Sequence, residues 1–105
     1  MDSQLKRGLV EYCVLANLAE GDSYGYEIVK SISRLMPITE STLYPILKRL
    51  EQQEKVETYS KEHNGRLRKY YRITREGRNS IAEFLVSWGE VEKIHQYIKG
   101  SVENG

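Results

Sequence analysis

The stretch ESTLYPILKRLEQQEKVETYSKEHNGRLRKYYRI, residues 40–73, decides the fold predicted for this chain of 105 residues. Its first part carries leucine and isoleucine at spacings of three and four, which predicts an amphipathic helix. The period then changes, and residues 56–60 and 67–73 are typical of β-strands. Because Asn64-Gly65 between them favours a tight turn, we predict a hairpin whose second strand is basic.

Two further amphipathic helices are predicted upstream, over residues 5–19 and 24–35. In both segments the apolar side chains recur at spacings of three and four. Gly21 is expected to end the first helix, and Asp22 and Ser23 are expected to cap the second.

The next helix, over residues 40–53, has several suitable starts, because Thr39, Ser41 and Thr42 are all good capping residues. Pro45 lacks an N–H, which favours a position near the first turn. This helix and the one before it form a helix–turn–helix pair, and a hairpin follows. That order is the winged-helix arrangement, in which the second helix of the pair enters the major groove of DNA and the hairpin is the wing.

The positive charge of the chain is concentrated in residues 66–78, which run from the second strand of this wing into the segment that follows it. The whole chain has a formal net charge of +1, yet residues 66–78 carry six basic side chains and one carboxylate, a net charge of +5. Such a basic stretch is typical of a nucleic-acid contact, and a solvated cationic face is the alternative. The winged-helix context favours DNA. The residues expected to hold phosphates are Lys48, Arg66, Arg68 and Lys69, with the Tyr44 hydroxyl and the helix N-terminus near Ser41.

Three tyrosines belong to the same region. Thr42 and Tyr44 are expected to contact base edges or thymine methyl groups, and a ring in the core is the alternative for Tyr44. Tyr70 and Tyr71 are neighbours on a strand, so their side chains must point to opposite faces. We therefore expect one of them in the core and the other on the surface of the wing.

A long helix over residues 75–98 is predicted after the hairpin, capped by Thr74 and ended by Gly100. Its apolar side chains follow a coiled-coil spacing for three heptads. A helix of about 24 residues is roughly 36 Å long, which one small winged helix cannot cover, so we predict a two-fold dimer. The residues expected at the dimer interface are Leu5, Leu9, Ile81, Phe84, Leu85, Trp88, Val91, His95 and Ile98. Trp88 either fills this interface or stacks on a flat apolar ligand.

The predicted fold class is mainly α with a small β-hairpin. Residues 1–74 are expected to form a winged helix-turn-helix DNA-binding domain, and residues 75–105 a C-terminal dimerisation helix and tail. A single cysteine, Cys13, excludes an internal disulfide and fits a reducing cytoplasm. No metal site, cofactor or membrane span is expected, and no catalytic constellation links the polar residues, so we do not expect an enzyme.

Three strings in order resemble the PadR family of bacterial transcriptional regulators: SYGYEIVKSI, STLYPILKRLE and NGRLRKYYRIT. The resemblance covers about residues 8–99, and the joint occurrence of the three strings is quite specific. The short part that follows, with SWGEVEKI, resembles the compact subfamily that includes multidrug-responsive members. Lys55 stands where the family usually has a glycine after the recognition helix.

The resemblance implies a dimeric repressor that binds a double-stranded, palindromic operator and is released by an aromatic or cationic hydrophobic effector. It matches Trp88 with a tryptophan that stacks on planar drugs and Glu92 with an acidic position near it. Tyr12 is larger than expected for a residue that faces such a pocket. The predicted ligand-binding residues are Tyr12, Trp88 and Glu92. The predicted DNA-binding residues are Ser41, Thr42, Tyr44, Lys48, Arg49, Gly65, Arg66, Arg68 and Lys69.

A winged helix that serves only protein–protein contacts, without a ligand response, is the alternative function. The net charge of +5 in residues 66–78 argues against that alternative. The interpretation that we carry forward is a cytoplasmic DNA-binding regulator.

Overall fold

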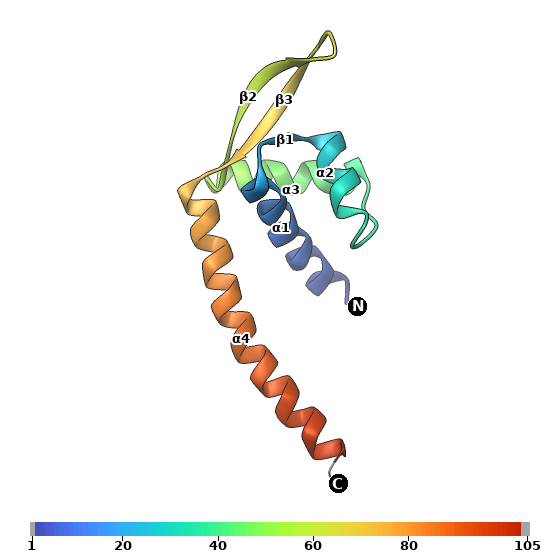
Figure 1. The fold of residues 1–105 in the computed structure, drawn as a ribbon, viewed down its shortest axis with the longest axis vertical. Helices are drawn as coiled ribbons and strands as arrows, with labels where there is room; N and C mark the ends of the chain where they lie inside the picture. Colours follow the sequence, from blue (N-terminus) through green and yellow to red (C-terminus); the bar gives the residue numbers. More distant parts are fainter. Residues whose placement is uncertain (1, 104–105) are drawn as a thin grey trace.

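The computed structural model describes residues 2–103 and is mainly helical, with one small sheet (Figure 1). The elements are α1 (Ser3–Glu20), β1 (Ser23–Tyr24), α2 (Gly25–Ile32), α3 (Glu40–Gln52), β2 (Val56–His63), β3 (Arg66–Ile73) and α4 (Arg75–Glu103). The first three helices gather at the base of the β2–β3 hairpin. The hairpin and α4 extend from that base in opposite directions, which makes the molecule 63 Å long.

The core lies where α1, α2, α3 and the base of the sheet meet. Apolar side chains at helical spacing fill it, and the largest fully buried ones are Val10, Val14, Leu15, Leu18, Ile28, Leu43, Leu47 and Leu50. Helix α1 also contacts α4, because Leu5 and Tyr12 line a hollow together with Phe84 and Trp88 of that helix, and Tyr12 packs against the core as well. The apolar side chains that recur along the first predicted helix therefore contact two different neighbours, the core and α4.

The helix ends show which capping predictions were right. Gly21 ends α1, and its backbone N–H donates to the carbonyl of Leu18. Thr39 caps α3, and its Oγ1 accepts from the backbone N–H of Thr42 at 3.3 Å. The predicted cap of the second helix is wrong, because α2 begins after Tyr24, which makes no side-chain capping bond.

Ser23 and Tyr24 form a strand instead, which the sequence did not predict. The sheet has the order β1-β3-β2 and is antiparallel throughout. Strand β1 pairs Ser23 with Tyr71 and Tyr24 with Tyr70, so it lies along the outer edge of β3. It therefore ties the base of the hairpin to the start of α2.

The hairpin confirms the predicted turn. Asn64 and Gly65 have φ values of 52° and 78°, the left-handed conformation that a two-residue hairpin turn requires at both positions. Strand β2 continues to His63, beyond the predicted end at residue 60, and pairs His63 with Arg66 across the turn.

Helix α4 begins as predicted and ends later. Thr74 Oγ1 accepts from the backbone N–H of Gly77 at 3.1 Å, which is a capping bond. The predicted end at Gly100 is wrong, because the helix continues to Glu103; a glycine in a helix costs only about 1 kcal/mol relative to alanine. The first turns of α4 pack on the core through Gly77 and Ile81. The predicted division into a DNA-binding domain over residues 1–74 and a dimerisation helix over residues 75–105 stays a prediction. Met1 and residues 104–105, which that division includes, lie outside the described residues.

Candidate nucleic-acid interface

Helix α3 presents an exposed face opposite its buried one. Leu43, Ile46, Leu47 and Leu50 are buried, and the residues on the opposite side are Ser41, Pro45, Lys48 and Gln52, all exposed. Pro45 lies in the second turn rather than the first, and its missing N–H leaves the carbonyl of Ser41 without the usual intrahelical donor. These side chains and the free carbonyl of Ser41 form the surface of α3 that could enter a groove of DNA.

Tyr44 lies at the edge of that face, on the side of the wing. Its side chain is 45% exposed, so the alternative of a core ring is wrong. It lines a hollow of about 260 Å³ together with Gly25, Arg68, Lys69 and Tyr71. Helix α3 and strand β3 therefore form one continuous surface at this point.

Thr42 and Arg49 lie at the other edge of the face, toward α1. The hydroxyl groups of Thr42 and Thr39 are 3.3 Å apart, which places Thr42 in the capping arrangement of the helix. Arg49 donates from Nε to the Glu11 carboxylate at 2.7 Å, and a second guanidinium nitrogen lies 2.6 Å from the same oxygen. Both predicted contact residues thus already have partners within the protein.

Strand β3 carries the basic residues of the wing toward the turn. Gly65 forms the turn and Arg66 follows it directly, opposite His63. The guanidinium of Arg68 lies 4.7 Å from the centre of the Tyr24 ring, and its Nε is buried without a hydrogen-bond partner. Within residues 2–103, neither Arg66 nor Arg68 forms an ion pair.

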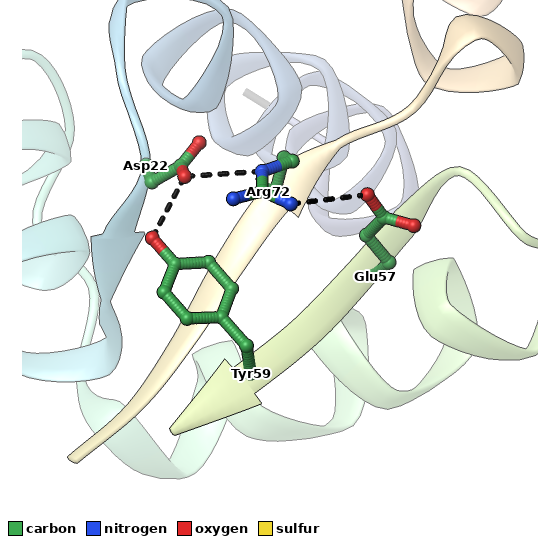
Figure 2. A network of polar contacts seen from close by, with 4 residues as sticks. All are labelled: Asp22, Glu57, Tyr59 and Arg72. Atoms are coloured by element: carbon green, nitrogen blue, oxygen red, sulfur yellow. Dashed lines mark hydrogen bonds and ion pairs between the residues drawn. The ribbon is translucent and has the colours of Figure 1, made fainter. Parts of the chain in front are cut away.

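Lys69 and Arg72, farther from the tip, are paired with carboxylates. Lys69 Nζ lies 3.9 Å from Glu51. Figure 2 shows Arg72 between two acidic side chains, with Nε donating to Asp22 at 3.2 Å and another nitrogen 3.6 Å from Glu57. The base of the wing is therefore neutralised, although the sequence makes it look as basic as the tip.

The same Asp22 carboxylate also accepts from the hydroxyl of Tyr59 at 2.7 Å (Figure 2). This hydrogen bond, followed by burial, raises the pKa of Tyr59 above its ordinary value, because it favours the protonated phenol. Asp22 precedes β1, Tyr59 lies on β2 and Arg72 lies on β3. One carboxylate therefore links the α1–β1 loop to both strands of the wing.

An aromatic cluster covers the outer face of the sheet. Tyr70 stacks on Tyr59 with ring centres 5.6 Å apart and meets the edge of Tyr24 at 5.3 Å. Tyr70 is buried by these rings, and Tyr71 on the opposite face is buried in the core, where burial raises its pKa. The expectation that one of the two lies on the wing surface is thus wrong: they do face opposite ways, but both faces are covered.

A second hollow lies between α1 and α4. It has a volume of about 410 Å³. Tyr12 packs against Phe84 with ring centres 4.2 Å apart, and Phe84 meets Trp88 edge-on at 5.8 Å. The other lining residues include Leu5, Leu9, Glu83 and Val91. The predicted Glu92 is exposed and does not line the hollow, whereas Glu83 does.

Farther along α4, most apolar side chains are exposed within residues 2–103. Ile81 packs on the core. The large apolar side chains of α4 that are more than a third exposed are Leu85, Val86, Trp88, Val91, Ile94, Tyr97, Ile98 and Val102. His95, predicted at the same interface, is exposed as well.

Comparison with known proteins gives the family. Residues 14–83 match the model of the transcriptional regulator PadR-like family. The chain belongs to this family. Similar solved structures include a protein from Streptococcus mutans, 45% identical, with a TM-score of 0.77 and coverage of 90% of this chain and 87% of that chain. A transcriptional regulator from Clostridium thermocellum is 38% identical, with a TM-score of 0.80 and coverage of 91% and 95%.

Bacillus subtilis PadR, solved in complex with operator DNA, shares the fold at 22% identity. Its TM-score is 0.68, with coverage of 74% of this chain and 47% of that chain. The PadR-like assignment confirms the suspected family and the winged-helix fold with its long C-terminal helix. Because the family consists of transcriptional regulators, the expectation that the chain is not an enzyme also agrees. None of the described helices is both long enough and apolar enough to cross a membrane.

Sequence reasoning overlooked part of this PadR-like surface. Gln52 lies on the exposed line of α3, and the spacing of eleven residues from Ser41 would have placed it there. The role of Asp22 as a partner of Tyr59 and Arg72 had no signal in the sequence, because its partners lie 37 and 50 residues away.

Proposed function

We propose that this PadR-like regulator binds double-stranded DNA through α3 and the tip of the wing, and thereby controls transcription in the cytoplasm. The observation that carries the proposal is the hollow shared by Tyr44, Arg68 and Lys69, which makes the exposed face of α3 and the basic edge of β3 one surface. Ser41 and Lys48 lie on the same helix face, and Arg66 extends the positive charge to the turn. A groove-reading helix beside a phosphate-holding hairpin is what duplex recognition requires.

The test measures affinity for duplex DNA as a function of salt concentration. Two DNA samples are used: unselected sheared genomic fragments of the host, and the fragment among them that binds most tightly. Each phosphate neutralised contributes about 0.9 to the slope of log affinity against log salt. Replacing Arg66→Ala is expected to reduce that slope by about one. Lys99→Ala is the control, since Lys99 lies near the end of α4 and should leave the slope unchanged. No binding of wild-type protein at low salt would favour the protein–protein alternative.

We also propose that the protein acts as a homodimer joined along α4. The support is the exposed apolar stripe on α4, which a second copy would cover with the same stripe. Two copies would present two α3 helices, as a palindromic operator needs. Leu85→Glu with Ile98→Glu is expected to give the mass of one chain in light scattering, whereas Lys93→Glu keeps the dimer. A monomeric wild-type protein would contradict this assembly.

The third proposal is an effector site between α1 and α4, for a planar aromatic compound. It is supported by the hollow of about 410 Å³ and by Trp88, which lines the hollow and is 37% exposed. An effector releases DNA only if it binds the DNA-free conformation more tightly. Because Trp88 is the single tryptophan, a planar aromatic cation or a phenolic acid that enters the hollow should quench the fluorescence. Phe84→Ala should weaken quenching, and absence of quenching by either class would remove the site.

A further inference from the structure

We propose that Gly25 is a positioning residue: it leaves the space in which the Tyr44 side chain rests, and so sets where Tyr44 stands on the DNA-facing surface. This inference rests on the proposed function, because it concerns how one of the proposed contact residues is held. Gly25 is the first residue of α2 and Tyr44 lies in α3, so the contact joins the two helices of the helix–turn–helix pair.

Backbone conformation does not explain why residue 25 is a glycine. Gly25 is helical and lies outside the left-handed region, so its conformation is open to any residue. Space is the reason. A Cβ atom at this position would lie 2.8 Å from Cζ of Tyr44, 3.1 Å from Cε1, and closest of all to the hydroxyl oxygen. Ordinary contacts between carbon atoms are about 3.5–4.0 Å, and only glycine therefore allows this position of the ring.

The contact lies at the surface and not in the core. Tyr44 is 45% exposed, whereas its neighbour Leu43 is fully buried. The atoms that a Cβ would meet belong to the far end of the tyrosine side chain. We expect this end of the side chain to turn toward solvent without any movement of the helix. We therefore expect alanine at position 25 to displace the Tyr44 ring and leave the fold intact. Alanine is also the better helix former, which offsets the small cost of that displacement.

Displacement of the ring has a consequence for recognition. The hydroxyl oxygen must move by about 1 Å to reach an ordinary separation from the new methyl group. Hydrogen bonds of hydroxyl groups require about 2.5–3.0 Å between the heavy atoms, so a shift of this size breaks one that Tyr44 makes to DNA. One lost hydrogen bond corresponds to roughly a fivefold loss of affinity. Contacts of Arg66 to phosphate do not depend on this ring.

The experiment is a double-mutant cycle on the full chain with the selected genomic duplex: wild type, Gly25→Ala, Tyr44→Ala and the double variant. We expect Gly25→Ala to reduce affinity for that duplex about fivefold, with little change for unselected fragments. In the Tyr44→Ala background, where the space is open, Gly25→Ala should have no further effect. Gly21→Ala is the matched control, since a Cβ there meets nothing within 4 Å; its affinity should equal that of the wild type.

The outcomes separate this inference from the proposed function. If the wild type binds no duplex, the proposed function fails. If the wild type binds and Gly25→Ala lowers affinity equally with and without the Tyr44 ring, Gly25 acts by another route and the inference is wrong. Unchanged affinity of Gly25→Ala also overturns it. If Gly25→Ala proves unstable, the double variant must regain the melting temperature of Tyr44→Ala, because Tyr44 supplies the three nearest atoms; failure to regain it overturns the inference as well.

Discussion

Gly77, at the start of α4, is the position where a single methyl group should disturb the fold most. A Cβ there would press on the backbone carbonyl oxygen of Lys55 and lie 2.7 Å from Cγ1 of Ile73. The Lys55 carbonyl cannot move freely, because it accepts from the backbone N–H of Thr74 at 3.0 Å. The hydroxyl of Thr74 in turn donates to the carbonyl of Glu54 at 2.6 Å. Gly77→Ala must therefore push α4 away from the junction between α3 and β2.

The magnitude follows from two opposing effects. Forcing an extra carbon into a packed position costs about 1–3 kcal/mol, and replacing a helical glycine by alanine returns about 0.5–1 kcal/mol. The expected net loss in the free energy of unfolding is about 1–2 kcal/mol. For a domain of about 100 residues, each kcal/mol lowers the melting temperature by about 4–8 °C. Gly77→Ala should consequently melt roughly 5–15 °C below the wild type.

The assay is thermal or urea unfolding followed by circular dichroism, at one protein concentration because dimerisation shifts apparent stability. Gly89→Ala is the control: it lies in the same helix, and its Cβ would meet nothing within 4 Å. That variant should be as stable as the wild type or more stable by up to about 1 kcal/mol. Equal stability of the two alanine variants would refute the packing argument, since both gain the same helix propensity.

Three further outcomes can be checked. The raised pKa of Tyr59 means that the folded state favours the phenol, so the contribution of Tyr59 to stability is present below pH 10 and is lost as pH rises through the folded pKa. In Asp22→Asn, the absorbance of the Tyr59 phenolate should therefore appear at lower pH than in the wild type. An unchanged titration would contradict the role of Asp22 in raising this pKa. Arg49→Ala should leave the salt slope of DNA binding unchanged, because Arg49 is already paired with Glu11. Loss of this partly exposed ion pair should lower the free energy of unfolding by at most about 1 kcal/mol. A salt slope reduced by one would show that Arg49 contacts a phosphate. Gly65→Ala should cost about 1–2 kcal/mol, because its φ of 78° strains any residue with a Cβ, and an unfolding curve equal to that of the wild type would exclude such strain.

The elements predicted correctly are those with local signals. The apolar spacing over residues 40–53 and the Asn64-Gly65 turn each specify structure within a few residues, and both are confirmed. Strand β1 has only two residues, and its pairing with β3 joins positions about 48 apart in sequence. No periodicity exists in two residues, so neither the strand nor the later start of α2 was predictable from the local pattern.

The candidate site shows the same division between local and distant information. Exposure of Ser41 and Lys48 follows from the spacing of the buried residues of α3, which the sequence displays. The pairing of Arg49 with Glu11 spans 38 residues, and that of Arg72 with Asp22 spans 50. Counting charges along the sequence cannot reveal such pairs, and it therefore overstates the positive charge that the surface offers to DNA.

The basic side chains of β3 consequently differ along the wing: those near its base are paired with carboxylates, and those near its tip are not. At its base, Arg72 is held by Asp22 and Glu57, and the neighbouring rings of Tyr59 and Tyr70 stack, so these side chains fix how the hairpin stands on the helices. Toward the tip, the basic side chains of β3 form no ion pair within residues 2–103. A phosphate contact at the base would first have to break internal ion pairs, whereas one at the tip would not. Strand β3 should therefore contribute about two phosphate contacts to the salt slope, through Arg66 and Arg68, and not the four that its basic side chains suggest.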